Sequence, residues 1–251
     1  MNNSLYIKSV ELTEEPKRDK FLLNLPIVKY LKSNKLEFKS PVTFIVGENG
    51  SGKSTLIEAV AVAYGFNAEG GTKNFHFETN NTVSELSQCI RLCKSGLIGD
   101  GFFLRAESFY NFASNIDELD KDISPIRNPS PPIKDSYGGI SLHRQSHGES
   151  FLSVVQNRLN SKGIYLLDEP EAALSPTRIM TLLVEINRLV KLGSQFIIST
   201  HSPILMAYPD ADILQLSPDG IERVKYNRTE HYIVTKEFLN NTDKMLDILL
   251  E

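Results

Sequence analysis

Short apolar runs without a polar face predict the interior strands of this chain. Such runs cover residues 42–46, 102–106 and 164–167, and residues 195–199 form a further strand. A continuous apolar run of this length is typical of a strand covered on both faces, as in a parallel sheet. Residues 5–12 alternate between apolar and polar side chains, and residues 35–38 form another short strand. The first 46 residues are therefore predicted to be rich in strands.

Segments with helical patterns lie between these strands. Residues 55–64 predict an apolar helix that ends at Gly65, and a capping box at 82–85 opens a helix that continues to about residue 94. Further helices are expected over 148–159, from Pro176 to just before Gly193, and over about 235–250. Residues 212–216 and 221–226 predict a hairpin, and the prolines and glycines of 124–139 predict a loop.

This order of strands and helices places the chain in the α/β class. A length of 251 residues fits one large α/β domain or two small ones. We expect a single domain, 1–251, built from three regions. These are an N-terminal β region with a glycine-rich loop (1–65), a helical and loop insert (66–145), and a C-terminal region that ends in the hairpin and a helix (146–251).

A glycine-rich segment with the Gly-x4-Gly-Lys-Ser pattern of a P-loop follows the strand at 42–46 directly. Backbone N–H groups of such a loop surround phosphate groups at the N-terminus of the next helix. Lys53 is then expected to reach the β- and γ-phosphates of a nucleotide, and Ser54 to bind Mg²⁺. A strand before the loop and a helix after it make a chance match a poor explanation. The predicted nucleotide-binding residues are Gly47, Glu48, Asn49, Gly50, Ser51, Gly52, Lys53, Ser54 and Thr55.

Two acidic residues and a histidine follow later strands. Asp168 ends the strand at 164–167, where a carboxylate that binds Mg²⁺ belongs, and Glu169 is placed to polarise an attacking water as general base. His201 comes just after the strand at 195–199, so we expect it near the γ-phosphate. Acidic strand ends also occur for solubility alone, and a lone histidine is more often a packing residue. The P-loop in the same chain favours the catalytic interpretation, with Lys53, Glu169 and His201 as catalytic residues.

Net charge, cysteine content and the lack of long apolar segments limit the partners and the location that the sequence predicts. The formal net charge is −4, so the chain as a whole does not attract nucleic acid by its charge. Lysines at 29, 32, 35 and 39 are more simply explained as a solvated turn than as a basic face. Cys89 and Cys93, four positions apart on the predicted helix, are expected to be reduced thiols, because no further ligands complete a metal site. Neither a membrane span nor a secretory signal is evident, which predicts a cytoplasmic protein without membrane insertion.

The motifs resemble those of the ATP-binding cassette (ABC) ATPases. The resemblance rests on residues 47–55, on the segment from Leu166-Leu167-Asp168-Glu169-Pro170 to Pro176, and on Ser199-Thr200-His201-Ser202-Pro203. More narrowly, the chain is similar to free-standing bacterial ATPases near the RecF and SMC types. The resemblance implies a P-loop NTPase fold of ABC type. It has a mixed central sheet flanked by helices, an antiparallel β subdomain and a small helical subdomain.

The resemblance also assigns roles to residues that the pattern alone leaves as a polar loop. Ser146 and Gly148 match the family's signature sequence, which contacts the γ-phosphate of ATP bound to a second subunit. His201 matches the family's switch histidine. The usual Q-loop glutamine is not evident, and Glu107 is the candidate to replace it as a metal ligand. His147 stands where transporters have glycine, and Phe21 and Tyr30 are only candidates for stacking on adenine.

We therefore expect an ATPase that binds ATP and Mg²⁺, forms a head-to-tail homodimer around two ATP molecules and times the action of an unidentified effector protein. The resemblance points to DNA maintenance or defence as the setting, although the net charge gives no support for DNA binding. The alternative is the ATP-hydrolysing subunit of a membrane ABC transporter. A third interpretation, an ATP-binding switch with negligible turnover, is disfavoured because Lys53, Asp168, Glu169 and His201 occur together.

Overall fold

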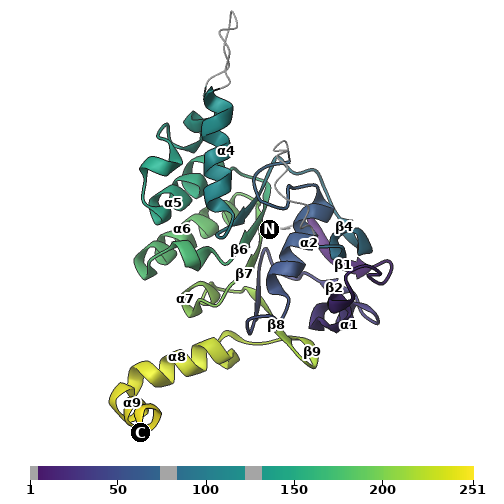
Figure 1. Cartoon of the computed structure of the whole chain (residues 1–251), viewed down its shortest axis with the longest axis vertical. Coiled ribbons are helices and arrows are strands. Elements are labelled where there is room, and N and C mark those ends of the chain that lie inside the picture. The colour runs from purple at the N-terminus through teal and green to yellow at the C-terminus, as the bar shows by residue number, and fades with distance from the viewer. Residues whose placement is uncertain (1–4, 74–83, 122–131) are drawn as a thin grey trace, which may run out of the picture.

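A six-stranded sheet forms the centre of the molecule (Figure 1). The computed structural model describes residues 5–73, 84–121 and 132–251. The strand order is β5-β6-β7-β3-β8-β9, and every neighbouring pair is parallel except the β8–β9 hairpin. This arrangement confirms the mixed sheet. The strands are β3 (Val42–Gly47), β5 (Asp100–Arg105), β6 (Gly163–Asp168), β7 (Gln195–Ser199), β8 (Asp212–Ser217) and β9 (Gly220–Arg223).

Helices cover both faces of this sheet, and β6 shows how its side chains divide between them. Ile164 and Leu166 pack on the side of α2 (Lys53–Tyr64), whereas Tyr165 and Leu167 face a second hydrophobic cluster. That second cluster lies beneath α4 (Phe109–Lys121), α5 (His147–Arg158) and α6 (Pro176–Lys191), which lie together on one side in Figure 1. Because both faces are covered, the apolar runs of the interior strands have no solvent-exposed side.

A separate antiparallel sheet in the order β2-β1-β4 supplies the expected β subdomain. Its strands are β1 (Ile7–Leu12), β2 (Leu36–Glu37) and β4 (Ile90–Lys94). The predicted helix over 82–94 is wrong within the described residues: a single turn, α3 (Leu86–Cys89), leads into β4. Ile90 and Leu92 point inward while Arg91 points to solvent, so pairing with β1 selects the two-residue period over the helical one. Residues 82 and 83 lie outside the described part of the chain.

Cys89 and Cys93 consequently do not share a helix face, because Cys89 is buried at the end of α3 and Cys93 is exposed on β4. Both are free thiols. Within residues 5–73, 84–121 and 132–251, no group of three or more histidine, cysteine, aspartate or glutamate side chains is arranged to hold a metal ion.

The C-terminal region departs from the prediction of one helix over 235–250. Two helices, α8 (Glu230–Asn240) and α9 (Thr242–Leu250), meet at Asn241, and α8 begins five residues earlier than expected because Thr229 caps it. The second strand of the predicted hairpin also ends earlier, at Arg223. Helices absent from the prediction are α1 (Pro26–Leu31), α4 and α7 (Pro203–Met206), and the described end of the predicted loop at 124–139 contains a 3-10 turn, Ile133–Tyr137.

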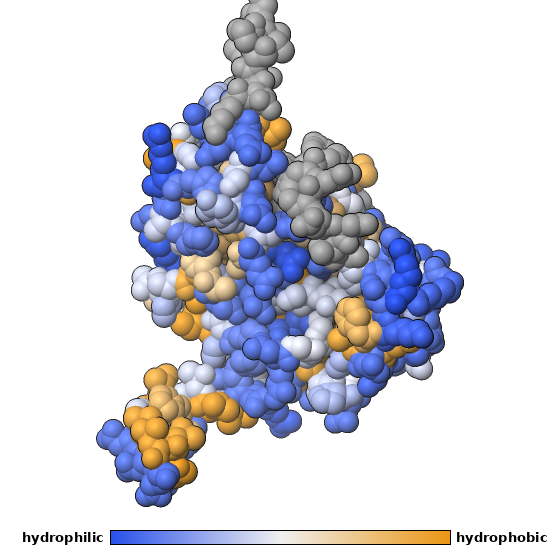
Figure 2. Space-filling view, in the orientation of Figure 1, coloured by the Kyte–Doolittle hydropathy of each residue, from blue (hydrophilic) through white to orange (hydrophobic). Residues whose placement is uncertain are grey.

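The pair α8–α9 extends from the body of the molecule as an arm (Figure 1), with hydrophobic side chains on its surface (Figure 2). Several of these side chains are more than half exposed. No helix in the described ranges is long and apolar enough to cross a membrane. The exposed apolar residues of the arm are Ile233, Val234, Leu239, Leu246, Ile248, Leu249 and Leu250.

Candidate active site

The glycine-rich loop connects β3 to α2, and its backbone is held in conformations that suit glycine. Gly47 has φ +147° and Gly52, just before α2, has φ +92°. A Cβ on Gly47 would lie 2.5 Å from the carbonyl oxygen of Leu216 on the neighbouring strand β8. The chain can therefore leave β3 and turn into α2 at this point only because residue 47 has no side chain.

Lys53 is the first residue of α2 and is 4% exposed. Its ammonium donates hydrogen bonds to the carbonyl oxygens of Gly47 and Glu48, each at 3.0 Å. Burial lowers the pKa of Lys53, although the nearby carboxylates of Glu169 and Asp168 act in the opposite direction. In this conformation Lys53 donates its hydrogen bonds to carbonyl groups of its own loop. A bound phosphate group would accept hydrogen bonds from the same ammonium.

Asp168 ends β6 and is 5% exposed. The parallel register places it beside Ser199 of β7 and Arg105 of β5. The Ser199 hydroxyl donates a hydrogen bond to the Asp168 carboxylate, and the Arg105 Nε lies 3.4 Å from the Asp168 Oδ2. Burial raises the pKa of Asp168, while hydrogen bonds from Ser199 and Ser54 and the charge of Arg105 lower it. The Ser54 hydroxyl and the Asp168 carboxylate thus meet as the hard oxygen ligands that Mg²⁺ prefers.

Glu169 follows in the left-handed region with φ +49°, which is uncommon for a residue other than glycine. Its backbone N–H donates to the Ser199 hydroxyl at 3.1 Å, which holds the turn against β7. The side chain is 35% exposed, and its Oε1 lies 3.5 Å from the Nε2 of His201. At that distance the two groups face each other without a formed hydrogen bond. The turn therefore directs a carboxylate with free oxygens toward the histidine.

His201 follows β7 and is held from two sides. Its backbone N–H donates to the buried carboxylate of Glu171, and its ring Nδ1 lies 2.9 Å from the Nε2 of His231 on α8. Burial lowers the pKa of His201 to about 4, and Lys53 and His231 contribute in the same direction. Burial lowers the pKa of His231 as well, so the neutral form is favoured in both rings.

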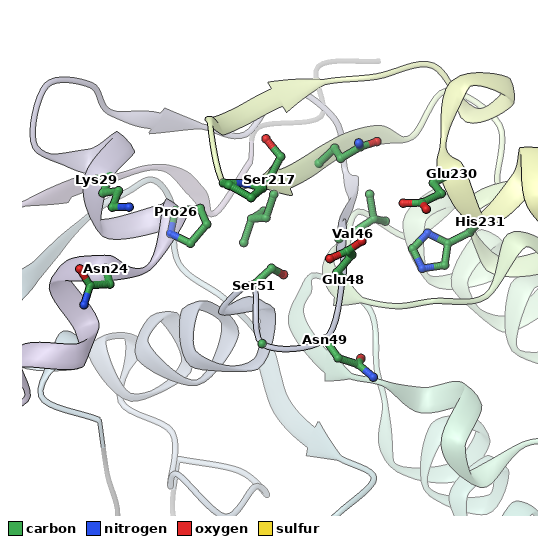
Figure 3. A pocket seen from close by; sticks show the side chains of 15 residues that line it. Asn24, Pro26, Lys29, Val46, Glu48, Asn49, Ser51, Ser217, Glu230 and His231 are labelled. Atoms are coloured by element: carbon green, nitrogen blue, oxygen red, sulfur yellow. The ribbon is translucent and has the colours of Figure 1, made fainter.

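Two cavities join these residues into one site. One, of about 440 Å³, lies between the P-loop, α1, the β8–β9 hairpin and the start of α8 (Figure 3). Asn24, Pro26 and Lys29 line it on the side of α1. The second, of about 530 Å³, is lined by Glu48 and Asn49 of the P-loop together with Glu169, His201 and His231. Phe21 and Tyr30, the candidates for stacking on adenine, line neither of these two cavities.

Ser146 and Gly148 stand apart from both cavities, at the start of α5 in the helical layer. Arg178 of α6 donates to the Ser146 hydroxyl at 3.1 Å and to Glu149 at 3.0 Å. A Cβ on Gly148 would lie 2.5 Å from Arg178 Nη1, so residue 148 leaves room for that guanidinium. Glu107 follows β5 with its side chain 83% exposed, 3.4 Å from Arg105. Its role as a metal ligand stays a prediction.

Sequence reasoning missed several residues that the structure places in the site. Arg105 lies at the end of a predicted buried strand and has no predicted role of its own, yet its guanidinium joins Asp168 to Glu58 of α2. Its position opposite Asp168 follows from the parallel pairing of β5 with β6, which no local sequence pattern indicates. Glu171 lies two residues after Glu169, but nothing in the sequence indicates that it binds the backbone of His201. No sequence signal links His231 to His201.

Fold and site together have the architecture of a P-loop nucleotide-binding domain. Two family models match the chain, one described as "AAA domain" over residues 27–129 and the other as "AAA domain, putative AbiEii toxin, Type IV TA system" over residues 99–207. Among solved structures, an SMC head bound to the C-terminal winged-helix domain of ScpA is similar, with a TM-score of 0.50 and 15% identity, covering 88% of this chain and 98% of that one. A nucleotide-free ATP-binding cassette from an ABC transporter has a TM-score of 0.50 and 17% identity, covering 92% of this chain and 94% of that one.

Curated relatives match over shorter stretches. The ribose import ATP-binding protein RbsA of Bacillus cereus is 23% identical over 168 residues, 62% of this chain and 34% of that protein. The UvrABC system protein A of Lactococcus lactis is 35% identical over 86 residues, 33% of this chain and 9% of that protein. The chain spans about a third of the length of the first of these relatives. Its fold is that of the ABC-type ATPases and SMC heads, and both family models that match it describe an AAA domain.

Proposed function

We propose that two copies of this chain assemble head to tail around two ATP molecules, and that hydrolysis opens the assembly and times the action of a partner. The observation that carries this proposal is the separation of the two phosphate-binding elements. The P-loop, Glu169 and His201 line adjoining cavities, whereas Ser146 and Gly148 start a helix in another layer and line neither of these cavities. A second copy of the chain would supply its turn with Ser146 and Gly148 to the phosphate bound by the first copy.

Within one chain, each residue has a defined task. Lys53 would exchange its two carbonyl acceptors for phosphate oxygens, and the backbone N–H groups of the loop would hold the remaining oxygens. Ser54 and Asp168 are the residues that would hold Mg²⁺, which supplies charge neutralisation between the phosphates when bound. Glu169 would accept a proton from the attacking water. His201, facing Glu169, would donate a hydrogen bond to the γ-phosphate region.

A glutamate-to-glutamine change at position 169 tests the assembly, because it removes the base without removing the side-chain volume. We expect Glu169→Gln to bind ATP, hydrolyse it at least about a hundredfold more slowly, and run as a dimer in MgATP by light scattering after gel filtration. Lys53→Ala is the control that loses ATP binding and remains monomeric. A monomeric Glu169→Gln protein at saturating MgATP would refute the head-to-tail dimer.

Mixing two inactive variants tests the head-to-tail geometry itself. Lys53→Ala lacks a working P-loop but keeps its Ser146 turn, and Ser146→Arg has the opposite defect. A mixed dimer therefore contains one complete composite site, and we expect ATPase activity to return on mixing. Each variant alone should be inactive. If the mixture is as inactive as its components, Ser146 does not act on the neighbouring chain's nucleotide.

DNA maintenance or defence is the setting we propose for the partner. The matched descriptions support it: a type IV toxin–antitoxin domain, an SMC head, and a protein of the UvrABC system. Stimulation of ATP turnover by duplex DNA, compared with the same concentration of heparin, tests whether DNA itself is the partner. Equal rates with and without DNA would leave a protein as the effector that the ATPase must serve.

The transporter alternative is favoured by one observation, the matches to ribose import ATP-binding proteins. It requires a docking site for a membrane subunit. Recovery of the Glu169→Gln chain with an integral membrane protein after mild detergent extraction would support that function over the first.

A further inference from the structure

His231 contacts the switch histidine although it lies thirty positions later in the chain. The two rings are 5.0 Å apart between centroids and inclined by 57°, and one nitrogen of each ring faces the other at 2.9 Å. His231 lies in the first turn of α8, whose start is fixed by the fully buried Thr229. The Thr229 hydroxyl donates to the Tyr226 carbonyl at 2.8 Å and accepts from the Tyr232 N–H at 3.3 Å. A capped helix therefore holds the second ring in place.

The role of this contact depends on which of the two facing ring nitrogens carries a proton. Two neutral imidazoles share one proton between the His201 Nδ1 and the His231 Nε2. If His201 carried that proton, its Nε2 would be a bare acceptor facing the Glu169 carboxylate, which is also an acceptor, at 3.5 Å. If His231 carries it, the Nε2 of His201 is an N–H donor. Only the second arrangement gives attraction toward Glu169 or a phosphate oxygen.

We propose that His231 is a positioning residue of the active site, which donates its Nε2 proton to His201 and so keeps an N–H on the His201 Nε2. The inference rests on the proposed role of His201 beside the γ-phosphate. It places the first turn of α8 inside the catalytic machinery. Charged groups that face the histidine pair are Lys53, Glu169 and Glu171 from the body and Glu230 from α8 itself.

The consequence is a mechanical link between the arm and ATP turnover. His231 lines the same cavity as His201 and Glu169, together with Val234 and Thr235 of the same helix. A shift of α8 that separates the rings would release the Nδ1 of His201, and the ring could then adopt the tautomer without an Nε2 proton. Anything that moves the arm would change the rate of the chemical step before it changed the binding of ATP.

Three substitutions at one position separate this role from simple packing. His231→Gln places an amide N–H close to the ring Nε2, His231→Glu offers only an acceptor there, and His231→Leu offers neither. We expect the Gln variant to keep kcat within about threefold. The Leu and Glu variants should lose about 10- to 100-fold in kcat, while KM for ATP changes less than about threefold. Lys236→Gln on the same helix, whose side chain is exposed, should leave both parameters unchanged.

The tautomer can be measured without ATP. In nucleotide-free protein labelled with ¹⁵N-histidine, we expect the His201 ring to show a protonated Nε2 and a bare Nδ1 in the wild type and in His231→Gln. In His231→Glu the ring should instead carry a proton on Nδ1. A wild-type His201 protonated on Nδ1, or a Leu variant with wild-type kcat, would overturn the proposal. Because the NMR result does not depend on turnover, failure of the proposed ATPase cycle and failure of this inference are distinguishable.

Discussion

Replacing Arg105 with methionine tests how the carboxylate of Asp168, the proposed metal ligand, is kept charged inside the protein. Arg105 is 17% exposed and lies between Glu58 at 2.9 Å and Asp168 at 3.4 Å, two carboxylates whose side chains are 12% and 5% exposed. Removing one partner of a buried ion pair costs about 3–5 kcal/mol, because the remaining charge keeps its desolvation penalty. For a chain of this size, that loss corresponds to a fall in melting temperature of roughly 6–20 °C.

The pH dependence of this loss follows from Asp168. Burial already raises the pKa of Asp168 above 3.8, and the charge of Arg105 is one of the influences that lower it. In Arg105→Met the folded-state pKa therefore rises further, while the unfolded-state pKa does not change. A group with a raised folded-state pKa destabilises the fold as the pH rises through that value. The deficit of the variant should thus be largest at neutral pH and shrink as the pH falls toward the raised pKa of Asp168.

Urea denaturation followed by circular dichroism, at neutral and at mildly acidic pH, measures both effects. Arg91→Met is the matched control, because Arg91 pairs with Glu11 at the surface, where the two side chains are 72% and 38% exposed and the pair contributes little. Adding Asp168→Asn to Arg105→Met should restore part of the lost stability. If Arg105→Met were as stable as Arg91→Met, or if Asp168→Asn destabilised it further, the electrostatic explanation would be wrong.

Two glycine substitutions test the phosphate-binding elements. Gly47→Ala combines φ +147° with a Cβ 2.5 Å from the Leu216 carbonyl oxygen, so about 1–3 kcal/mol of strain should weaken binding of a fluorescent ATP analogue by about 5- to 150-fold. Gly65→Ala, with φ +108° and open space around it, is the control that should keep the wild-type affinity. Gly148→Ala would place its Cβ 2.9 Å from the Ala173 carbonyl oxygen, so we expect unchanged ATP affinity in the monomer and a roughly tenfold slower turnover; wild-type turnover would contradict that expectation.

Local sequence patterns were sufficient to predict an element where the residues that specify it are neighbours in the chain. The apolar run at 42–46 and the glycines after it predict β3, the loop and α2, because each of these elements is specified by neighbouring residues. The 164–167 run likewise predicts β6 and the position of Asp168 at its end. Ser175 and Pro176 predict the start of α6, where the Ser175 hydroxyl accepts from the Arg178 N–H.

Long-range pairing explains what the sequence could not predict. The residues of β4 follow a helical turn, and only their pairing with β1 selects the extended form. Arg105 has its role because β5 lies beside β6, and its partner Glu58 comes from a helix that begins more than fifty residues earlier. His231 enters the site from a separate helix. In each case the decisive contact joins segments that are distant along the chain, which a periodicity within one segment does not reveal.

Both proposed phosphate-binding elements of the free chain already have internal partners, which an assembly around ATP must replace. Lys53 donates to two carbonyl groups of its own loop, and Ser146 accepts from Arg178. A nucleotide must replace the first set, and a neighbouring nucleotide the second, at about 0.5–1.5 kcal/mol for each hydrogen bond given up. A single chain recovers only the P-loop contacts, whereas a closed dimer recovers both sets at each of two sites. The free energy gained by closing should therefore increase with each bound nucleotide, so that hydrolysis at either site weakens the pair.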